Sequence, residues 1–108
     1  MAGGQLGEGQ NWFLKALSVF EKVGDDHRAA ASCSGLGALA GQRGDLLESG
    51  RWLVRAVRTL LHTSDPHEAG RNARNFRVTY DRANGGERKE LERMWREAGL
   101  GDLPAAPK

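Results

Sequence analysis

The chain has 108 residues, of which 39% are hydrophobic, so it is long enough for one small domain with a thin core. Sixteen basic and 14 acidic side chains leave a formal net charge of +2, which is too small to indicate nucleic-acid binding by itself. The single cysteine excludes a disulfide framework, and with neither a membrane-spanning segment nor a signal-peptide pattern in the sequence we expect a cytoplasmic protein.

The first half of the chain predicts two helices after a flexible, glycine-rich segment at residues 1–8. Apolar residues recur at helical spacing over residues 9–22 and again over residues 27–42. Between them, Gly24 is a typical helix stop and the following aspartates are typical helix caps. Strands are not expected, because β-branched and aromatic residues are few and do not alternate with polar ones.

The second half predicts three more helices. The third covers residues 46–62, after the turn Arg43-Gly44-Asp45. Pro66 marks the first turn of a fourth helix at residues 67–83. Asn84-Gly85-Gly86 separates it from a fifth at residues 87–98, and the remaining residues, 99–108, are expected to form a flexible tail.

The sequence repeats itself with a period of 40 residues, which points to a unit of one helical hairpin. Trp12 and Ala16 correspond to Trp52 and Ala56, so each of two tryptophans is followed four positions later by an alanine. The same offset aligns further residues of the two halves: Asp25 with Asp65, His27 with His67, Ala29 with Ala69, and Leu36 with Phe76.

The central hairpin, at residues 30–61, resembles a tetratricopeptide (TPR) repeat, and the resemblance extends over residues 9–98. The matching residues are Leu36-Gly37, Ala40, Gly44-Asp45, Ser49, Leu53 and Ala56. The resemblance implies an all-α fold, a right-handed α-solenoid of antiparallel hairpins with about five helices. The long period is similar to that of repeats in bacterial signalling ATPases and regulators. Arg77 departs from the pattern, because it stands where the close-packing glycine belongs.

The TPR resemblance also implies a non-catalytic scaffold that binds a peptide or partner protein in its concave groove. The first helices of the hairpins line that groove in this family. By repeat alignment, the expected partner-binding residues are on the second and fourth predicted helices: Ser34, Ala38, Arg71, Arg74, Asn75 and Val78. Small residues then face a wall of guanidinium groups, which suits a ligand with an acidic group. The alternative is an ordinary solvated charged face.

A second possible function is assembly of subunits. The chain opens with the second helix of a repeat, so we expect either a fragment of a larger protein or a subunit whose open end another chain covers. The corresponding surface would include four aromatic residues, Trp12, Phe13, Phe20 and Trp52. The alternative for the two tryptophans is packing between successive second helices.

No catalytic motif is visible in the sequence, so we expect neither an enzyme nor a cofactor. His62, Asp65 and His67 have no standard metal-ligand spacing and are interpreted as turn residues, while Cys33 is interpreted as core. A third possible function is weak nucleic-acid binding through arginines of the fourth helix: Arg71, Arg74, Arg77 and Arg82.

Overall fold

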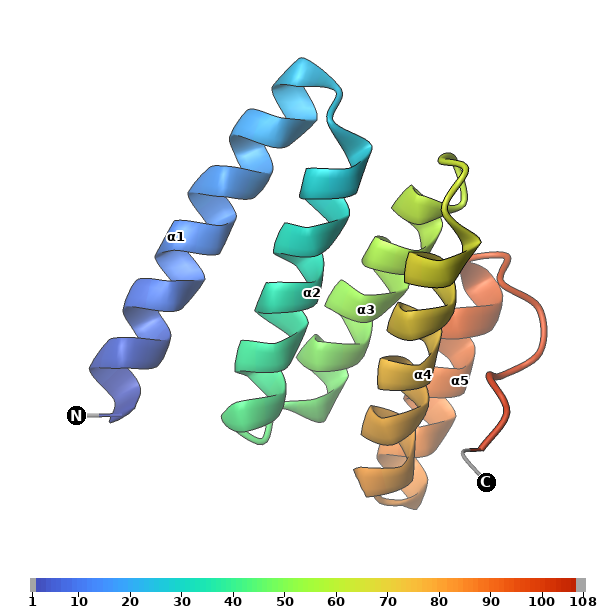
Figure 1. The fold of residues 1–108 in the computed structure, drawn as a ribbon. Helices are drawn as coiled ribbons and strands as arrows, with labels where there is room; N and C mark the ends of the chain where they lie inside the picture. The colour runs from blue at the N-terminus through green and yellow to red at the C-terminus, as the bar shows by residue number, and fades with distance from the viewer. Residues whose placement is uncertain (1, 107–108) are drawn as a thin grey trace.

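The chain folds into five α-helices, with no strand among the described residues (Figure 1). This computed structural model describes residues 2–106, and side chains from residue 7 onward. The helices are α1 (Ala2–Val23), α2 (Asp26–Gln42), α3 (Leu46–Leu60), α4 (Pro66–Arg82) and α5 (Gly85–Glu97). The all-α prediction is therefore confirmed.

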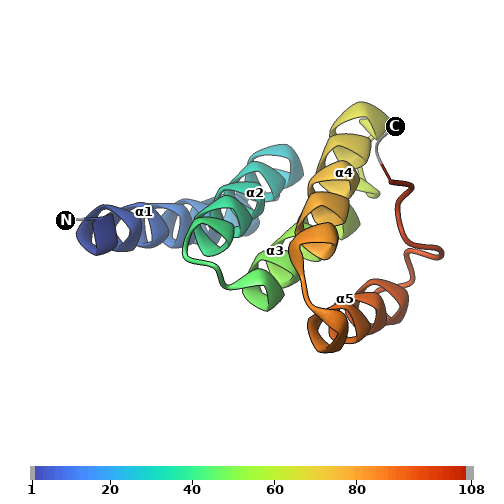
Figure 2. The same cartoon turned by 90° about the horizontal axis from the view of Figure 1, so that it is seen from below.

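Each helix runs antiparallel to the one before it (Figure 1). Along the chain, α1 contacts α2, α2 contacts α3, and α3 contacts α4. Helix α5 lies against both α3 and α4, so α3 is in contact with three other helices, as the view from below also shows (Figure 2). None of the helices within residues 2–106 combines the length and hydrophobicity needed to cross a membrane.

The helix starts are fixed by local side-chain chemistry, largely as the sequence predicts. Asp25, Asp45 and Asp65 each cap a helix, and each carboxylate accepts a hydrogen bond of 3.1 Å from the backbone N–H three residues later. Asn84 and Glu87 form a reciprocal capping box at the start of α5. The predicted helix ends are therefore accurate to within two residues for both ends of α2 to α5 and for the C-terminal end of α1.

The beginning of the chain differs from the prediction. Helix α1 starts at Ala2 rather than at residue 9, so most of the segment 1–8 is helical. Extending an existing helix costs only about 1 kcal/mol per glycine relative to alanine, far less than starting a new one. Just after this segment, the Gln10 side chain accepts a 2.8 Å hydrogen bond from Arg43 and so ties α1 to the end of α2. Residue 1 lies outside the described residues.

The tail also differs from the expectation of a flexible segment, because it folds back onto α4 and α5. The indole Nε1 of Trp95 donates a 2.8 Å hydrogen bond to the backbone oxygen of Asp102. Arg77 donates through Nη1 to the backbone oxygen of Pro104 at 3.3 Å. Leu100 and Leu103 pack against the buried residues beneath them. Residues 107–108 of the predicted tail lie outside the described residues.

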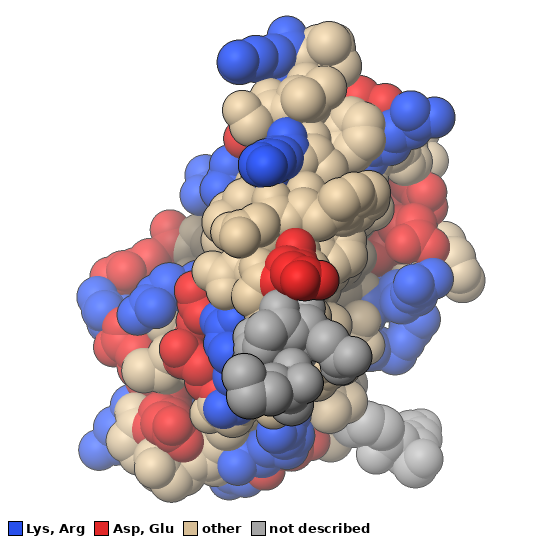
Figure 3. All heavy atoms as spheres, turned by 90° about the vertical axis from the view of Figure 1, so that its left-hand side faces the viewer, with Lys and Arg blue, Asp and Glu red and all other residues tan. Residues whose placement is uncertain are grey.

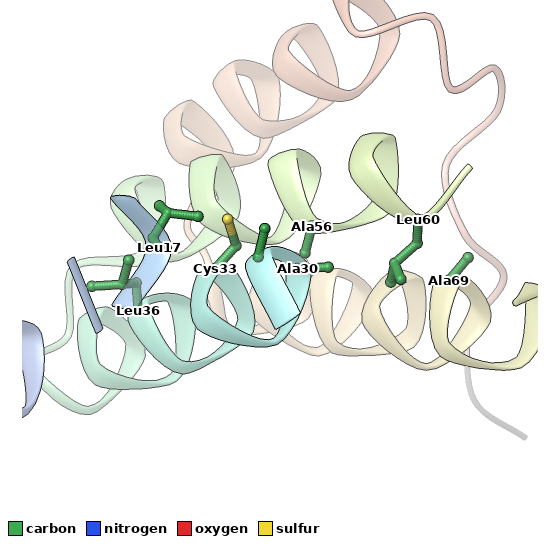
Figure 4. Close-up of a cluster of buried hydrophobic side chains, with 8 residues drawn as sticks. Leu17, Ala30, Cys33, Leu36, Ala56, Leu60 and Ala69 are labelled. Atoms are coloured by element: carbon green, nitrogen blue, oxygen red, sulfur yellow. The ribbon is translucent and has the colours of Figure 1, made fainter. Parts of the chain in front are cut away.

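The core has two clusters that share α3. The first joins α1, α2, α3 and the start of α4, and Figure 4 shows its labelled side chains pointing toward one another: Leu17, Ala30, Cys33, Leu36, Ala56, Leu60 and Ala69. The second joins α3 to α4, α5 and the tail, around Leu53, Val57, Phe76, Leu91 and Trp95. Because α3 contributes to both clusters, it holds α2 and α4 at fixed positions on either side of it.

Candidate functional site

A hollow of about 520 Å³ lies between α2 and α4, with α3 beneath it. Helix α2 contributes small residues, including Ser34 and Ala38, and α4 contributes Asn75 and Val78. These four residues were all predicted to bind a partner, and the structure brings them together in one surface depression. Val78 is 49% exposed, so the hollow presents an accessible apolar side chain beside polar ones.

The base of the hollow exists because α2 approaches α3 closely at Gly37. A Cβ atom at this position would stand 3.1 Å from the Leu53 Cγ and 3.3 Å from the backbone oxygen of Ser49. Any larger side chain would push the two helices apart. Leu53 and Ser49 consequently line the bottom of the hollow, and the α2 side of it consists largely of backbone and short side chains.

Hydrogen bonds between side chains join α4 to α2 and α3 beside the hollow. The Ser34 hydroxyl donates to Oδ1 of Asn72, and the Asn72 Nδ2 donates at 3.0 Å to the backbone oxygen of Glu68. The hydroxyls of Ser49 and Thr79 lie 3.4 Å apart and share a hydrogen bond. The Ser34 hydroxyl proton is therefore already used, and its oxygen remains available as a hydrogen-bond acceptor.

Asn72 and Thr79 were missed by the sequence analysis, although the sequence contains a signal for them. Both lie on the buried stripe of α4 together with Ala69 and Phe76, at spacings of three and four residues. A polar side chain on a buried stripe requires a hydrogen-bond partner. The partners lie on the neighbouring helices, where Ser34 of α2 is half-buried and Ser49 of α3 is buried.

The arginines of α4 do not form the predicted wall. Arg71 and Arg74 are exposed, and neither lines the hollow. Arg71 continues the row that Asn75, Val78 and Arg82 form at spacings of four, three and four, but it lies beyond the hollow and pairs with Glu68 at 3.4 Å. Arg82 lines the hollow instead, and its Nη2 donates a 3.3 Å hydrogen bond to the backbone oxygen of Gly41 on α2.

The electrostatics of the hollow are set by this single guanidinium group. Of the described residues that line the hollow, Arg82 carries the charge, and the others are neutral. Arg77, by contrast, turns toward the tail, where it pairs with Asp81 at 3.0 Å and lies over the Tyr80 ring. Arg77 and Arg82 thus point to different surroundings, the tail and α2, while Arg71 and Arg74 are exposed outside the hollow.

The four aromatic residues predicted as an assembly surface have different environments. Trp12 is 64% exposed and meets the Phe13 ring edge to face, with centroids 5.1 Å apart. Phe13, Phe20 and Trp52 are partly buried against the first core cluster. The Phe13 ring lies directly on Gly35 of α2, where a Cβ atom would collide with it. Only Trp12 of the four therefore projects freely into solvent.

The cysteine and the residues around the third turn show no sign of a reactive or metal-binding site among the described residues. Burial raises the pKa of the Cys33 thiol to about 11, so this cysteine is protonated and unreactive at neutral pH. Asp65 caps α4, and its carboxylate lies 3.6 Å from Nδ1 of His27. His62 and His67 are exposed, and the described residues contain no group of three side chains suited to hold a metal ion.

Comparisons of the chain with models of protein families, with curated proteins and with solved structures found no match.

Proposed function

We propose that this chain is a non-catalytic protein-interaction module, built as a right-handed, TPR-like α-solenoid, that binds a partner segment in the hollow between α2 and α4. The 40-residue period supports the repeat architecture, because residues 40 positions apart have the same structural role. Asp25 and Asp65 cap α2 and α4 with the same hydrogen bond, and Leu36 and Phe76 are both buried. The first helices of successive hairpins, α2 and α4, form the two walls.

The observation that carries the binding proposal is the hollow itself. Small side chains on α2 leave the backbone of that wall accessible, as an extended peptide requires. Val78 offers an apolar contact, Asn75 offers hydrogen bonds, and the guanidinium of Arg82 favours a carboxylate. The partner is therefore a short extended segment of a protein that carries an acidic side chain or a free C-terminal carboxylate.

A selection with displayed random peptides tests this proposal. The library is bound to the parent chain and depleted on the variant Ala38→Trp, which fills the hollow from an exposed position. We expect enriched peptides with an acidic residue or a carboxyl end. Their affinity, measured by fluorescence anisotropy, should fall about tenfold or more for Arg82→Gln, since charge-assisted hydrogen bonds contribute about 1.5–3 kcal/mol.

Arg93→Gln is the matched control, because Arg93 is an exposed arginine on α5. It should leave peptide affinity unchanged. Enriched peptides that bind Ala38→Trp as well as the parent would overturn the assignment of the hollow. Binding of mixed-sequence single-stranded DNA or RNA that declines log-linearly with salt, in preference to peptides, would instead support the nucleic-acid alternative.

A further inference from the structure

Helix α1 carries an apolar stripe on a side that the other described residues leave uncovered. Of six large hydrophobic residues exposed within the described part of the chain, four lie on α1. Trp12, Val19 and Val23 are 64%, 57% and 70% exposed. With Ala16 they form the α1 stripe, spaced by four, three and four residues along one face. Figure 3 looks onto this side, where uncharged surface runs along the helix.

The equivalent face of α3 shows how such a stripe is covered inside this protein. Trp52 and Ala56 lie 40 residues after Trp12 and Ala16. Ala56 has no exposed surface, and Trp52 packs against the cluster that contains Leu17 of α1. On α3, therefore, this face makes a helix-to-helix contact, whereas on α1 the equivalent Trp12 is exposed and Ala16 is half-buried. A patch of this kind marks an interface.

The opposite end of the molecule does not complement the α1 stripe. On α5, Arg93 pairs with Glu90 and Glu97, and Arg96 pairs with Glu92. A head-to-tail stack of copies would place these charged groups against exposed apolar side chains, at a cost in desolvation. A stripe that repeats large and small residues along one helix can instead match itself across a twofold axis.

We infer that two copies of this chain associate through their α1 helices, packed antiparallel about a twofold axis. In this register two large side chains of the stripe, Trp12 and Val19, each meet a small residue. Trp12 lies against Ala16 of the second copy, and Val19 lies against Gly9 of the second copy. Such large-to-small pairing lets two helices interlock closely along a seam with heptad spacing. The 22 residues of α1 supply a seam about 33 Å long.

Charge on the flank of the stripe selects the antiparallel orientation. Glu8, Lys15 and Lys22 are exposed and seven residues apart, so they form one row beside the stripe. In the antiparallel register Glu8 faces Lys22 of the second copy, and the symmetry makes this pair occur twice. Lys15 faces Lys15 of the second copy at the twofold axis. A parallel arrangement would leave Glu8 and Lys22 about 21 Å apart along the helix.

Sedimentation equilibrium of the full chain tests the interface. We expect a mass that rises with concentration from 11.8 kDa toward twice that value. Val19→Glu should weaken the dimer more than about thirtyfold, because it places a charge within an apolar contact. Leu61→Glu is the control, an exposed large hydrophobic residue at the end of α3, away from both the α1 stripe and the hollow. A monomer at all concentrations up to millimolar, or a dimer indifferent to Val19→Glu, would overturn the inference.

Charge reversal tests the register. Glu8→Lys and Lys22→Glu should each weaken the dimer about tenfold, since two ion pairs become two repulsions. The double variant should return the dissociation constant to within about threefold of the parent. Lys15→Gln should tighten the dimer about twofold, since it removes one repulsion. Single and double variants that dimerise alike would overturn the antiparallel arrangement. Loss of peptide binding in Ala38→Trp is independent of all these outcomes.

Discussion

The indole of Trp95 on α5 holds the tail by donating a 2.8 Å hydrogen bond to the backbone oxygen of Asp102. The same ring packs against Phe76 on α4, with centroids 4.7 Å apart. Trp95 thus links α5, the C-terminal tail and the second core cluster. Leu103, which follows Asp102, extends this contact over the buried residues. The tail is therefore part of the folded domain.

Removal of the tail should lower stability. A chain that ends at Leu100 loses the Leu103 contact and the hydrogen bonds at Asp102 and Pro104. The expected loss is about 2 kcal/mol, which corresponds to a melting temperature lower by roughly 8–16 °C for a domain of this size. Circular dichroism measures it. A chain that ends at Ala105 retains all three contacts and should melt like the parent.

Loss of the buried amide on α4 should also destabilise the protein. Asn72→Ala leaves the Ser34 hydroxyl without its acceptor and removes the hydrogen bond to the Glu68 backbone. We expect a cost of about 1–3 kcal/mol, measured by urea unfolding. Asn75→Ala, an exposed asparagine one turn away, should change stability by less than about 0.5 kcal/mol. Equal effects of the two variants would contradict this account.

A single methyl group at Gly50 should be poorly tolerated. A Cβ atom there would overlap Cδ2 of Leu91, which is a core side chain with no exposed surface. Gly50→Ala should therefore cost about 1–3 kcal/mol in thermal or chemical unfolding. Gly70→Ala is the control, because the nearest atom to its Cβ is the end of the exposed Arg74 side chain at 3.6 Å. It should be neutral or stabilising by about 0.5–1 kcal/mol.

The same reasoning applies with a larger group at Gly37. Gly37→Leu would drive a side chain into Leu53 and separate α2 from α3. The expected loss is again about 1–3 kcal/mol, and the thin core makes partial unfolding of the chain visible as lost helical signal. Gly41→Ala is the matched control, since its Cβ would have its nearest neighbours at 3.6 Å. A melting temperature of Gly37→Leu within one or two degrees of the parent would contradict the close approach.

The buried thiol should make stability depend on pH above 9. Desolvation raises the pKa of Cys33 from its ordinary value of 9.0 to about 11, while Arg55 opposes the shift and Glu21 adds to it. Between these values the unfolded chain loses a proton that the folded chain keeps, so stability falls as pH rises from 9 to 11. As pH rises from 9 to 11, the free energy of unfolding of the parent should fall relative to that of Cys33→Ala, which lacks the thiol.

Alkylation checks the same protonation state more directly. At pH 8 iodoacetamide should modify Cys33 far more slowly in the folded chain than in guanidinium chloride, because the folded site is both buried and protonated. Equal rates in the two conditions would show that the thiol is accessible and would contradict the burial of α2 between its neighbours.

Local chemistry made much of this fold predictable from the sequence. Asp45 and Asn84 cap helices because a short polar side chain can reach the free backbone N–H groups of the first turn. Gly24 and Gly44 end helices with φ angles of 75° and 80°, which favour glycine. These interactions involve residues close in sequence, so they can be identified without knowing what lies across the molecule. The number, type and approximate ends of the helices follow from them.

Long-range contacts decided what the sequence pattern alone could not. The spacing of Arg71, Asn75, Val78 and Arg82 places them on one helix face, but only the position of α2 shows that the hollow lies beside Arg82 and ends before Arg71. The tail carries no helical pattern, and its place depends on the Trp95 indole reaching a backbone oxygen seven residues later. Long-range contacts also decide which tryptophan is exposed. Trp12 and Trp52 have matching sequence surroundings, yet Trp52 packs against the first core cluster and Trp12 is 64% exposed.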